Sequence, residues 1–551
     1  MSGFVTGPEA YVAVYPFEGG QYILSGNNAS LLDLSVSKNI RGQVGTFSML
    51  LAPGGPYGLN ARPSWTDLLT PMSLVVIGIA RGSYREIVMI GVVQSCQETQ
   101  DWHTNKGVMR TISVVGADFQ YFFSLASYYT LSFLAGTSAA VVGGAAGLQA
   151  LLSNSLLSAT PNAFGEAWYK KIMAGPQSIM ASLSFPYNGG RVSFYDMVAQ
   201  FWEPYDSNIE IPFADYFMLS EGSWQQKFMK VFPFPFYEFF VTTCPKGYYP
   251  GTALPSPNVI PATTYLNLPG FPDSSPQIVA RVNPLPWTRP TQAASNSGTF
   301  PQVEWDQSYW LNLPVYTTNE NSGIENRIYF DDSEVRNFYV INPVQLSALF
   351  GQSNSSNSPF IYTFASFADV ASIHRYGYRP QIQDIEWFYD SAGQYAQSLT
   401  AGGGTPEDFQ TFVQQLALRQ TSYFEPTPNM AKGQITMRLR PDIFPGTTFE
   451  FTPYKNQELW KFYIEGVSHR FTFGGMSTTT LTLSRGLPNA VYADSNLMIA
   501  LSTGNAQRKD GVYQAGLPSG LGPPLTPVNY QNIVGQGLIG DIAQIFNKAQ
   551  Y

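Results

Sequence analysis

Charged residues are scarce in this sequence. They make up 12% of the 551 residues, whereas aromatic residues reach 15%; typical soluble domains carry roughly 25% charged residues. A chain with so much uncharged surface stays soluble when partner proteins cover a large part of it. The formal net charge is −8 and no basic run occurs, which argues against tight binding of bare nucleic acid. The composition therefore predicts a subunit of a large assembly.

Cysteine and histidine are also rare. Cys96 and Cys244 lie far apart in the sequence, so they indicate neither a disulfide framework nor a metal cluster and fit a reducing cytoplasm. The three histidines, His103, His374 and His469, do not pair locally with carboxylates. No nucleophile elbow, phosphate loop, zinc-protease helix or calcium loop is present. We expect a chain that is not an enzyme, with no catalytic, cofactor-binding or metal-binding residues and no cofactor.

Long apolar runs are nearly absent. The N-terminus lacks a basic region followed by an apolar stretch, so export by the usual secretory route is not expected. Residues 131–152 have about the length of a bilayer span, but glycine, serine and threonine dilute their hydropathy and no Lys or Arg flanks them. We expect no membrane span, and interpret this stretch as a small-residue insertion that continues into a helix over residues 163–173.

Four segments near the C-terminus alternate apolar and polar residues, the period of a half-buried β-strand. Pro445-Gly446 predicts a turn, and Gly466 predicts a bend or bulge within the third segment. The segments are GQITMRLRP (433–441), TTFEF (447–451), WKFYIEGVSHRFTF (460–473) and TTTLTLSRGLP (478–488). Four antiparallel strands of this kind predict a small barrel.

The N-terminal region repeats this scheme in the same order. Its segments are GTFSMLLAP (45–53), MSLVVIG (72–78), EIVMIGVVQSC (86–96) and RTISVVG (110–116). Aligning glycines in pairs brings each strand opposite its counterpart and places Gln94 opposite His469; the pairs are Gly45 with Gly433, Gly91 with Gly466 and Gly116 with Gly486. Two hairpin-rich segments can share such a pattern by chance, so periodicity alone leaves this open.

Several short sequence segments in these strands resemble those of a known protein family. FYIEGVSHRFTFGG followed by TTTLTLSRGLP, together with RGQVGTFSML, MIGVVQSCQE and ISVVGADFQ, resembles baseplate hub proteins of contractile-tailed bacteriophages, the late-control D group included. PFYEFFV (235–241) and IVARVNPLPW (278–287) resemble the strand pair of the connecting domain in that family. The matching words cover about half of the chain, and residues 121–200 and those after Leu501 inherit nothing from the resemblance.

The resemblance implies a mainly β fold with α insertions, in which two similar small β-barrel modules are joined by a mixed α/β connecting region. The expected division is a first barrel (1–120), an insertion (121–200), a connecting domain (201–318), a mixed segment that contributes to the second barrel (319–400), a helix and second barrel (401–500), and a tail (501–551). The positions expected to define the barrels are Gly45, Gly91, Gly116, Gly433, Gly466, His469, Arg485 and Gly486.

Two helices complete the expectations. Thr405-Pro-Glu-Asp408 is a capping box with proline at the first helical position, followed by an apolar face of Phe409, Phe412, Val413 and Leu416. The acidic pairs Asp331-Asp332 and Glu407-Asp408 are interpreted as a turn and as helix N-terminal acids rather than as glycosidase carboxylates. In the tail, a short amphipathic helix is expected to dock on a partner through Ile539, Ile542, Ile545 and Phe546.

The function implied by the resemblance is mechanical. Three chains would form a ring of six barrels that adapts a hexameric tail tube to a trimeric central spike. The expected partners are other copies of the chain, the tube and spike proteins, the tape measure and wedge proteins, and DNA only in transit through a neutral or acidic channel. The chain would belong to the virion baseplate, assembled in the host cytoplasm. The alternatives are a tail-associated cell-envelope hydrolase and a receptor-binding or decorating virion β protein.

Overall fold

The computed structural model describes residues 7–121, 222–248, 268–290, 303–343, 365–385, 420–515 and 526–528, with short gaps, and the short strands at 127–128, 184–187 and 190–193. The expected helices over 163–173 and after Thr405, and the expected tail helix with Ile539 to Phe546, lie outside these residues. Among the described residues, no helix is long and apolar enough to cross a membrane.

The first half of the fold consists of seven strands and one short helix. All four strands expected between residues 45 and 116 are present, and three further strands precede them. The elements are β1 (Glu9–Tyr15), β2 (Tyr22–Ser25), β3 (Leu31–Asn39), β4 (Thr46–Leu51), α1 (Trp65–Leu68), β5 (Leu74–Arg81), β6 (Tyr84–His103) and β7 (Gly107–Asp118).

The second half contains the four strands expected between residues 433 and 488, with two strands from the preceding segment at its edges. The elements are β16 (Val315–Thr317), β17 (Gly323–Tyr329), β21 (Ala431–Arg438), β22 (Thr448–Phe451), β23 (Trp460–Thr472) and β24 (Thr478–Pro488), followed by α14 (Asn489–Ala493) and α15 (Ser495–Ser502). Gly446 has φ +75°, as the predicted turn requires. The pairing of β23 with β24 shifts register between Ile464 and Gly466, so the predicted bulge lies where expected.

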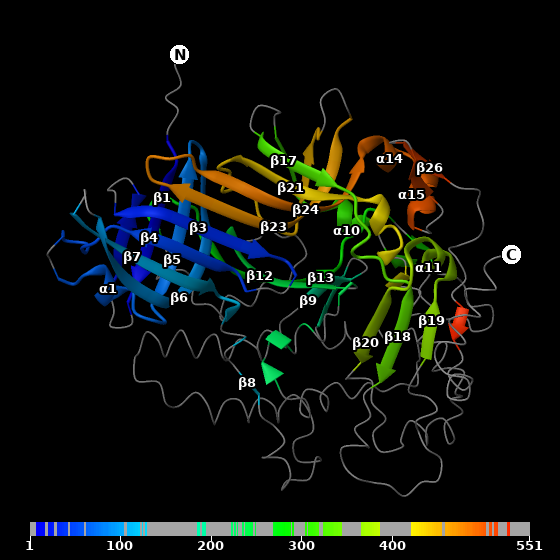
Figure 1. Cartoon of the computed structure of the whole chain (residues 1–551), viewed down its shortest axis with the longest axis horizontal. Coiled ribbons are helices and arrows are strands. Elements are labelled where there is room, and N and C mark those ends of the chain that lie inside the picture. The colour runs from blue at the N-terminus through cyan, green and yellow to red at the C-terminus, as the bar shows by residue number, and fades with distance from the viewer. Residues whose placement is uncertain are drawn as a thin grey trace, which may run out of the picture.

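Both halves belong to one 13-stranded sheet. Its order is β17-β21-β24-β23-β3-β4-β7-β6-β5-β1-β2, with β16 and β22 attached beside β23. The halves join where β23 pairs antiparallel with β3, from Gly466 opposite Asn39 to Thr472 opposite Asp33. In Figure 1 the orange β23 and β24 accordingly reach across to the blue first half.

The expectation of a mainly β fold is confirmed. Four strands are ordered β4-β7-β6-β5 in the first half and β21-β24-β23-β22 in the second. Within the described residues, however, the strands follow one open path rather than two closed barrels. The physical reason is that the far end of β23 pairs with β3 and so joins the two halves edge to edge.

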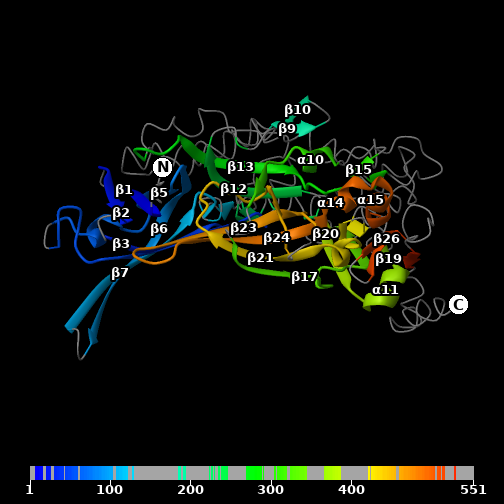
Figure 2. The same ribbon diagram turned by 90° about the horizontal axis from the view of Figure 1, so that it is seen from above.

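A second layer covers the sheet near the junction. β12 (Tyr237–Pro245) and β13 (Ser274–Val282) form an antiparallel hairpin at the place of the two connecting-domain segments, and Figure 2 shows it as a layer beside β23 and β24. Phe240, Cys244 and Val279 of the hairpin share a core with Ile40 from the first half and Tyr463 from the second. Burying this apolar surface fixes the hairpin against both halves.

The other elements are short. β18 (Phe338–Pro343), β19 (Ala365–Ala368), β20 (Pro380–Ile385) and β27 (Thr526–Val528) form a separate four-stranded sheet that accompanies α11 (Val370–Tyr376). The rest are β8 (Ser127–Tyr128), β9 (Ser184–Tyr187), β10 (Gly190–Ser193), β11 (Gly222–Ser223), β14 (Arg289–Pro290), β15 (Val303–Trp305), α10 (Ser308–Leu311), η6 (Thr427–Asn429), β25 (Ala506–Lys509) and β26 (Val512–Ala515).

Candidate functional site

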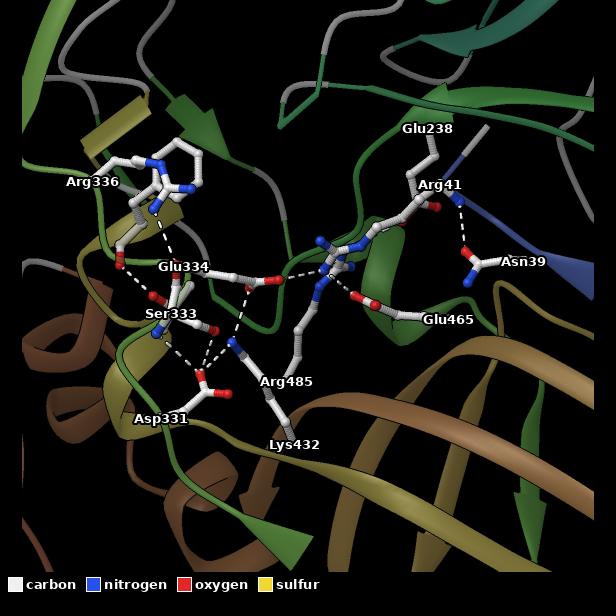
Figure 3. A network of polar contacts seen from close by, with 12 residues as sticks. Asn39, Arg41, Glu238, Asp331, Ser333, Glu334, Arg336, Lys432, Glu465 and Arg485 are labelled. Carbon is white, nitrogen blue, oxygen red and sulfur yellow. Dashed lines mark hydrogen bonds and ion pairs between the residues drawn. The ribbon is translucent and has the colours of Figure 1, made fainter. Parts of the chain in front are cut away.

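Charged side chains from separate parts of the sequence meet beside the β3–β23 junction. We call this group the polar seam; Figure 3 shows most of its members. Arg41 follows β3, Glu238 and Arg281 lie on the β12–β13 hairpin, Glu334 follows β17, Lys432 lies on β21, Glu465 on β23 and Arg485 on β24. In a chain with only 12% charged residues, this concentration is the most conspicuous polar feature of the described residues.

The inner part of the seam surrounds Glu238. Its Oε2 accepts a hydrogen bond from Arg281 Nε at 3.1 Å and a short one from the Tyr463 hydroxyl. Arg485 approaches the other carboxylate oxygen, with Nη2 at 3.4 Å from Oε1. Arg281 also donates to the Gly446 carbonyl at 2.6 Å. These bonds connect the hairpin to both β23 and β24.

Arg485 is the most constrained member of the seam. Its side chain is only 2% exposed, its guanidinium lies 4.1 Å from the centre of the Tyr463 ring, and its Nη1 donates to the Pro284 carbonyl at 2.6 Å. Its backbone has φ +55°, a left-handed conformation that is uncommon for residues with a side chain. This position requires a planar cation that stacks on the Tyr463 ring and donates several hydrogen bonds in fixed directions. Arginine meets both requirements and lysine does not.

The outer part of the seam ties the two halves together by ion pairs. Arg41 Nη2 lies 2.8 Å from Glu334 Oε1 and 2.7 Å from Glu465 Oε1. Lys432 Nζ lies 3.2 Å from the other Glu334 oxygen and 2.8 Å from Asp331 Oδ1. Arg41 comes from the first half and Glu334 and Glu465 from the second, so the two Arg41 pairs resist sliding along the junction. The Lys432 pairs lie within the second half and hold Glu334 in place.

The pKa directions follow from this pairing. Burial raises the pKa of the Glu334 carboxyl, but the neighbouring Arg41 and Lys432 charges outweigh it and hold the pKa below its usual value. Burial also raises the pKa of the Tyr463 hydroxyl well above its usual value, although Arg281 opposes this. Glu334 is therefore ionised at neutral pH, and Tyr463 is neutral and donates its hydroxyl hydrogen to Glu238.

Two further buried residues of opposite charge, Lys38 and Asp118, influence each other electrostatically near the contact of the first half with the hairpin. Lys38 Nζ donates to Thr242 Oγ1 and to the Thr243 carbonyl, both at 3.2 Å. Asp118 Oδ1 accepts from the Gln120 backbone N–H at 2.9 Å, while its Oδ2 has no hydrogen-bond partner in the described part of the chain. Burial raises the pKa of Asp118 to about 7, although Lys38 opposes this, and burial lowers the pKa of Lys38 to about 8.

Replacing Asp118 with asparagine should alter how stability depends on pH. The folded pKa of about 7 lies above the ordinary value of 3.8, so stability due to protonated Asp118 is full below the ordinary value and is lost as pH rises through about 7. Each pKa unit corresponds to about 1.4 kcal/mol. We expect the wild-type free energy of unfolding to decline relative to Asp118→Asn across this window, measured by urea denaturation. Parallel profiles of the two proteins would contradict the assignment.

The residues predicted from sequence take different positions. Arg485 lies in the polar seam, and His469 is buried on β23, where its Nδ1 is 2.9 Å from Thr479 Oγ1. Burial and the Lys38 charge lower the pKa of His469 to about 3, so its ring is neutral. The predicted glycines lie within or beside strands of the sheet.

The strand registers correct part of the glycine alignment. Met49, Val114 and Cys96 are successive partners in the first half. In the second half the corresponding row is Met437, Thr479 and His469. With Gly45 matched to Gly433, His469 therefore corresponds to Cys96 and not to Gln94.

The other two glycine pairs also shift. Gly116 faces Phe47 on β4, and the matching row places Leu481 opposite Ile435, so Gly116 does not correspond to Gly486. Gly91 pairs directly with Asp118 within a continuous β6, and the register shift falls between Val93 and Ser95 instead. Bulges at different places in the two halves displace these glycines relative to one another.

Sequence reasoning missed the rest of the seam. Asp331 and Asp332 do lie between strands, as expected for a turn, but each also forms an ion pair, with Lys432 and Arg379 respectively. The sequence feature that could have identified these residues is a charged residue within an otherwise apolar strand. Examples are Glu238 in FYEFFV, Arg281 in IVARVN and Glu465 in FYIEGV. Such positions require a buried partner.

The arrangement joins three segments of the chain by ion pairs and hydrogen bonds. The seam cations each contact a carboxylate, and no group of three or more His, Cys, Asp or Glu residues that could hold a metal ion is found among the described residues. What the geometry provides is a set of buried bonds across three segments of the chain.

These features define a mainly β protein whose two halves share one sheet. No family model matches the chain, and a comparison with curated protein sequences finds no match. Among solved structures, the chain is similar to a tail protein from Neisseria meningitidis MC58, at a TM-score of 0.40 and 11% identity over 87% of this chain and 97% of that one.

Two further solved structures are similar. The 43 kDa tail protein of prophage MuSo2 from Shewanella oneidensis has a TM-score of 0.39 and 11% identity over 87% of this chain and 98% of its own. The prophage tail protein gp18 from Listeria monocytogenes EGD-e has a TM-score of 0.32 and 9% identity over 86% and 94%.

Proposed function

We propose that this chain is a structural hub of a phage tail baseplate. Three copies form a ring in which each contributes two similar strand groups, giving near-sixfold symmetry toward a hexameric tail tube and threefold symmetry toward a trimeric spike. DNA passes through the central channel, and the protein acts by holding its neighbours in place rather than by catalysis.

The observation that carries the proposal is the repeated strand order, β4-β7-β6-β5 and β21-β24-β23-β22, within one sheet. Two equivalent groups in one chain are what a threefold body needs to match a sixfold one. The polar seam supports the proposal because Arg41, Glu465 and Glu334 fix the two groups relative to each other. The scarcity of charge fits extensive permanent interfaces, which are depleted in charged residues.

The proposal predicts a defined particle. Light scattering of the purified full-length chain should give three times the 60.8 kDa of one copy, and electron microscopy should show a threefold ring with six lobes around a channel. A chain that remains a monomer at high concentration contradicts the proposal. Degradation of purified cell-envelope material by that monomer would favour the hydrolase alternative.

A further inference from the structure

The two halves can be matched strand by strand beyond the four repeated strands. β3 precedes β4 and pairs with it, and β17 precedes β21 in the chain and pairs with it in the same way. When Gly45 is matched to Gly433, Thr46 corresponds to Gln434. Their cross-strand partners Ser37 and Arg327 then correspond as well. β3 and β17 then end at equivalent positions, Asn39 and Tyr329, so β17 is the second-half counterpart of β3.

One edge of β23 is shared by two partners. β22 pairs with residues 460–463 of β23, and β3 pairs with residues 466–472 along the same edge, because β24 occupies the opposite one. This second pairing is the junction between the halves. It also buries His469 at the centre of the paired stretch, opposite Val36.

The equivalent edge of β6 is only half occupied. β5 pairs with residues 84–92, and the last bonds on this edge join Val93 to Met72 and Ser73. Beyond Val93, no described strand pairs with this edge, although β7 continues along the other one to His103. Residues 94–100 are exposed or half-buried, and Figure 2 shows the β6–β7 hairpin projecting from the body.

β17 is exposed where its counterpart β3 is covered. β17 is an end strand of the sheet, paired only with β21 among the described strands, and Ile324 and Tyr329 are 44% and 51% exposed. Beside it lies a hollow of about 350 Å³ lined in part by Ile324, Ile435, Phe451 and Leu459. An edge strand whose outer N–H and C=O groups are exposed is a template for pairing with another chain.

We infer that β17 of one copy pairs antiparallel with the free edge of β6 in the next copy, as β3 pairs with β23 within each chain. The inference rests on the proposed ring and names its subunit contact. Val36 pairs with His469 within the chain. Asn326 is the counterpart of Val36 and Cys96 is the counterpart of His469, so Asn326 is expected opposite Cys96 of the neighbouring copy. The contact is head-to-tail, the type that generates a ring when the rotation between copies closes, as the proposed trimer requires.

Cysteine cross-linking tests the pairing and its register. Residues directly opposite each other across two paired strands lie within the Cα separation that a disulfide spans. In the variant Asn326→Cys, the new thiol can therefore form a disulfide with Cys96 of the neighbouring copy. Burial and Glu98 raise the pKa of Cys96, so oxidised glutathione is applied at mildly alkaline pH. We expect covalent dimers and trimers on a non-reducing gel, and their loss in Asn326→Cys/Cys96→Ser. The matched control Arg327→Cys points to the opposite face of β17 and should not cross-link.

Assembly is measured on the same samples. If the chain is monomeric, the proposed ring itself fails; if Asn326→Cys is trimeric and stays uncross-linked, the pairing is overturned while the ring stands. Hydrogen exchange on the unmodified protein gives an independent reading. Amides of residues 323–329 and 95–100 should become protected on assembly, and unchanged fast exchange at both strands in a trimer overturns the inference.

Discussion

Arg485→Ala should destabilise the chain by about 3–5 kcal/mol, the range expected when one partner of a buried ion pair is removed. Arg485 and Glu238 are 2% and 3% exposed, so neither group is compensated by water once the other is lost. The change also leaves the Pro284 carbonyl without the donor that Arg485 supplies. Chemical denaturation of the purified protein, followed by tryptophan fluorescence, measures the loss.

Two further variants help to interpret this loss of stability: one keeps the charge but not the packing, and the other removes an exposed ion pair as a control. Arg485→Lys keeps the charge but loses the planar stack at 4.1 Å over Tyr463, so its stability should lie between those of the wild type and Arg485→Ala. Arg327→Ala removes an ion pair with Glu325 in which both side chains are more than half exposed, and such pairs contribute about 0–1 kcal/mol. Equal losses from Arg485→Ala and Arg327→Ala would refute a central role for the seam.

The sequence predicted the strands well because their signal is local. Alternation places Phe449 and Phe451 on one face of a strand regardless of what the strand packs against, and all eight repeated strands are present. β3 has the same local signal, with Leu34 and Val36 alternating with Ser35 and Ser37, but it precedes the repeated segments and was not predicted.

The junction and the seam could not be predicted in the same way, because they depend on contacts between distant residues. Gly466 meets Asn39 across 427 positions of the chain, and no periodicity records which edge a strand will choose. Arg485 was identified through a resemblance in the words around it, but its partner Glu238 is 247 residues away. Partner choice depends on tertiary packing, whereas strand formation depends on neighbours in sequence.

The glycine positions show where local sequence patterns stop being informative and contacts between distant residues decide the structure. Glycine within a strand marks either a bulge or a close approach of another group, and the sequence does not say which. Gly466 lies at a bulge with only ordinary contacts, its added Cβ lying 3.4 Å from Lys38 O and from Thr482. At Gly116, an added Cβ would lie 2.2 Å from the Phe47 ring and 2.3 Å from the Val92 carbonyl oxygen.

Gly116→Ala should therefore destabilise the fold strongly, and Gly466→Ala should not. Phe47 is 1% exposed and belongs to the core of the first half, and the Val92 carbonyl belongs to β6, so neither can withdraw without disturbing packing or strand pairing. Overpacking of this kind costs typically 1–3 kcal/mol and occasionally more; we expect about 3 kcal/mol for Gly116→Ala and less than about 1 kcal/mol for Gly466→Ala. Both are measured by urea denaturation under identical conditions. Equal effects at the two glycines would mean that the crowding around Gly116 relaxes easily, and that β7 tolerates changes beside β6, the strand that carries the proposed subunit contact.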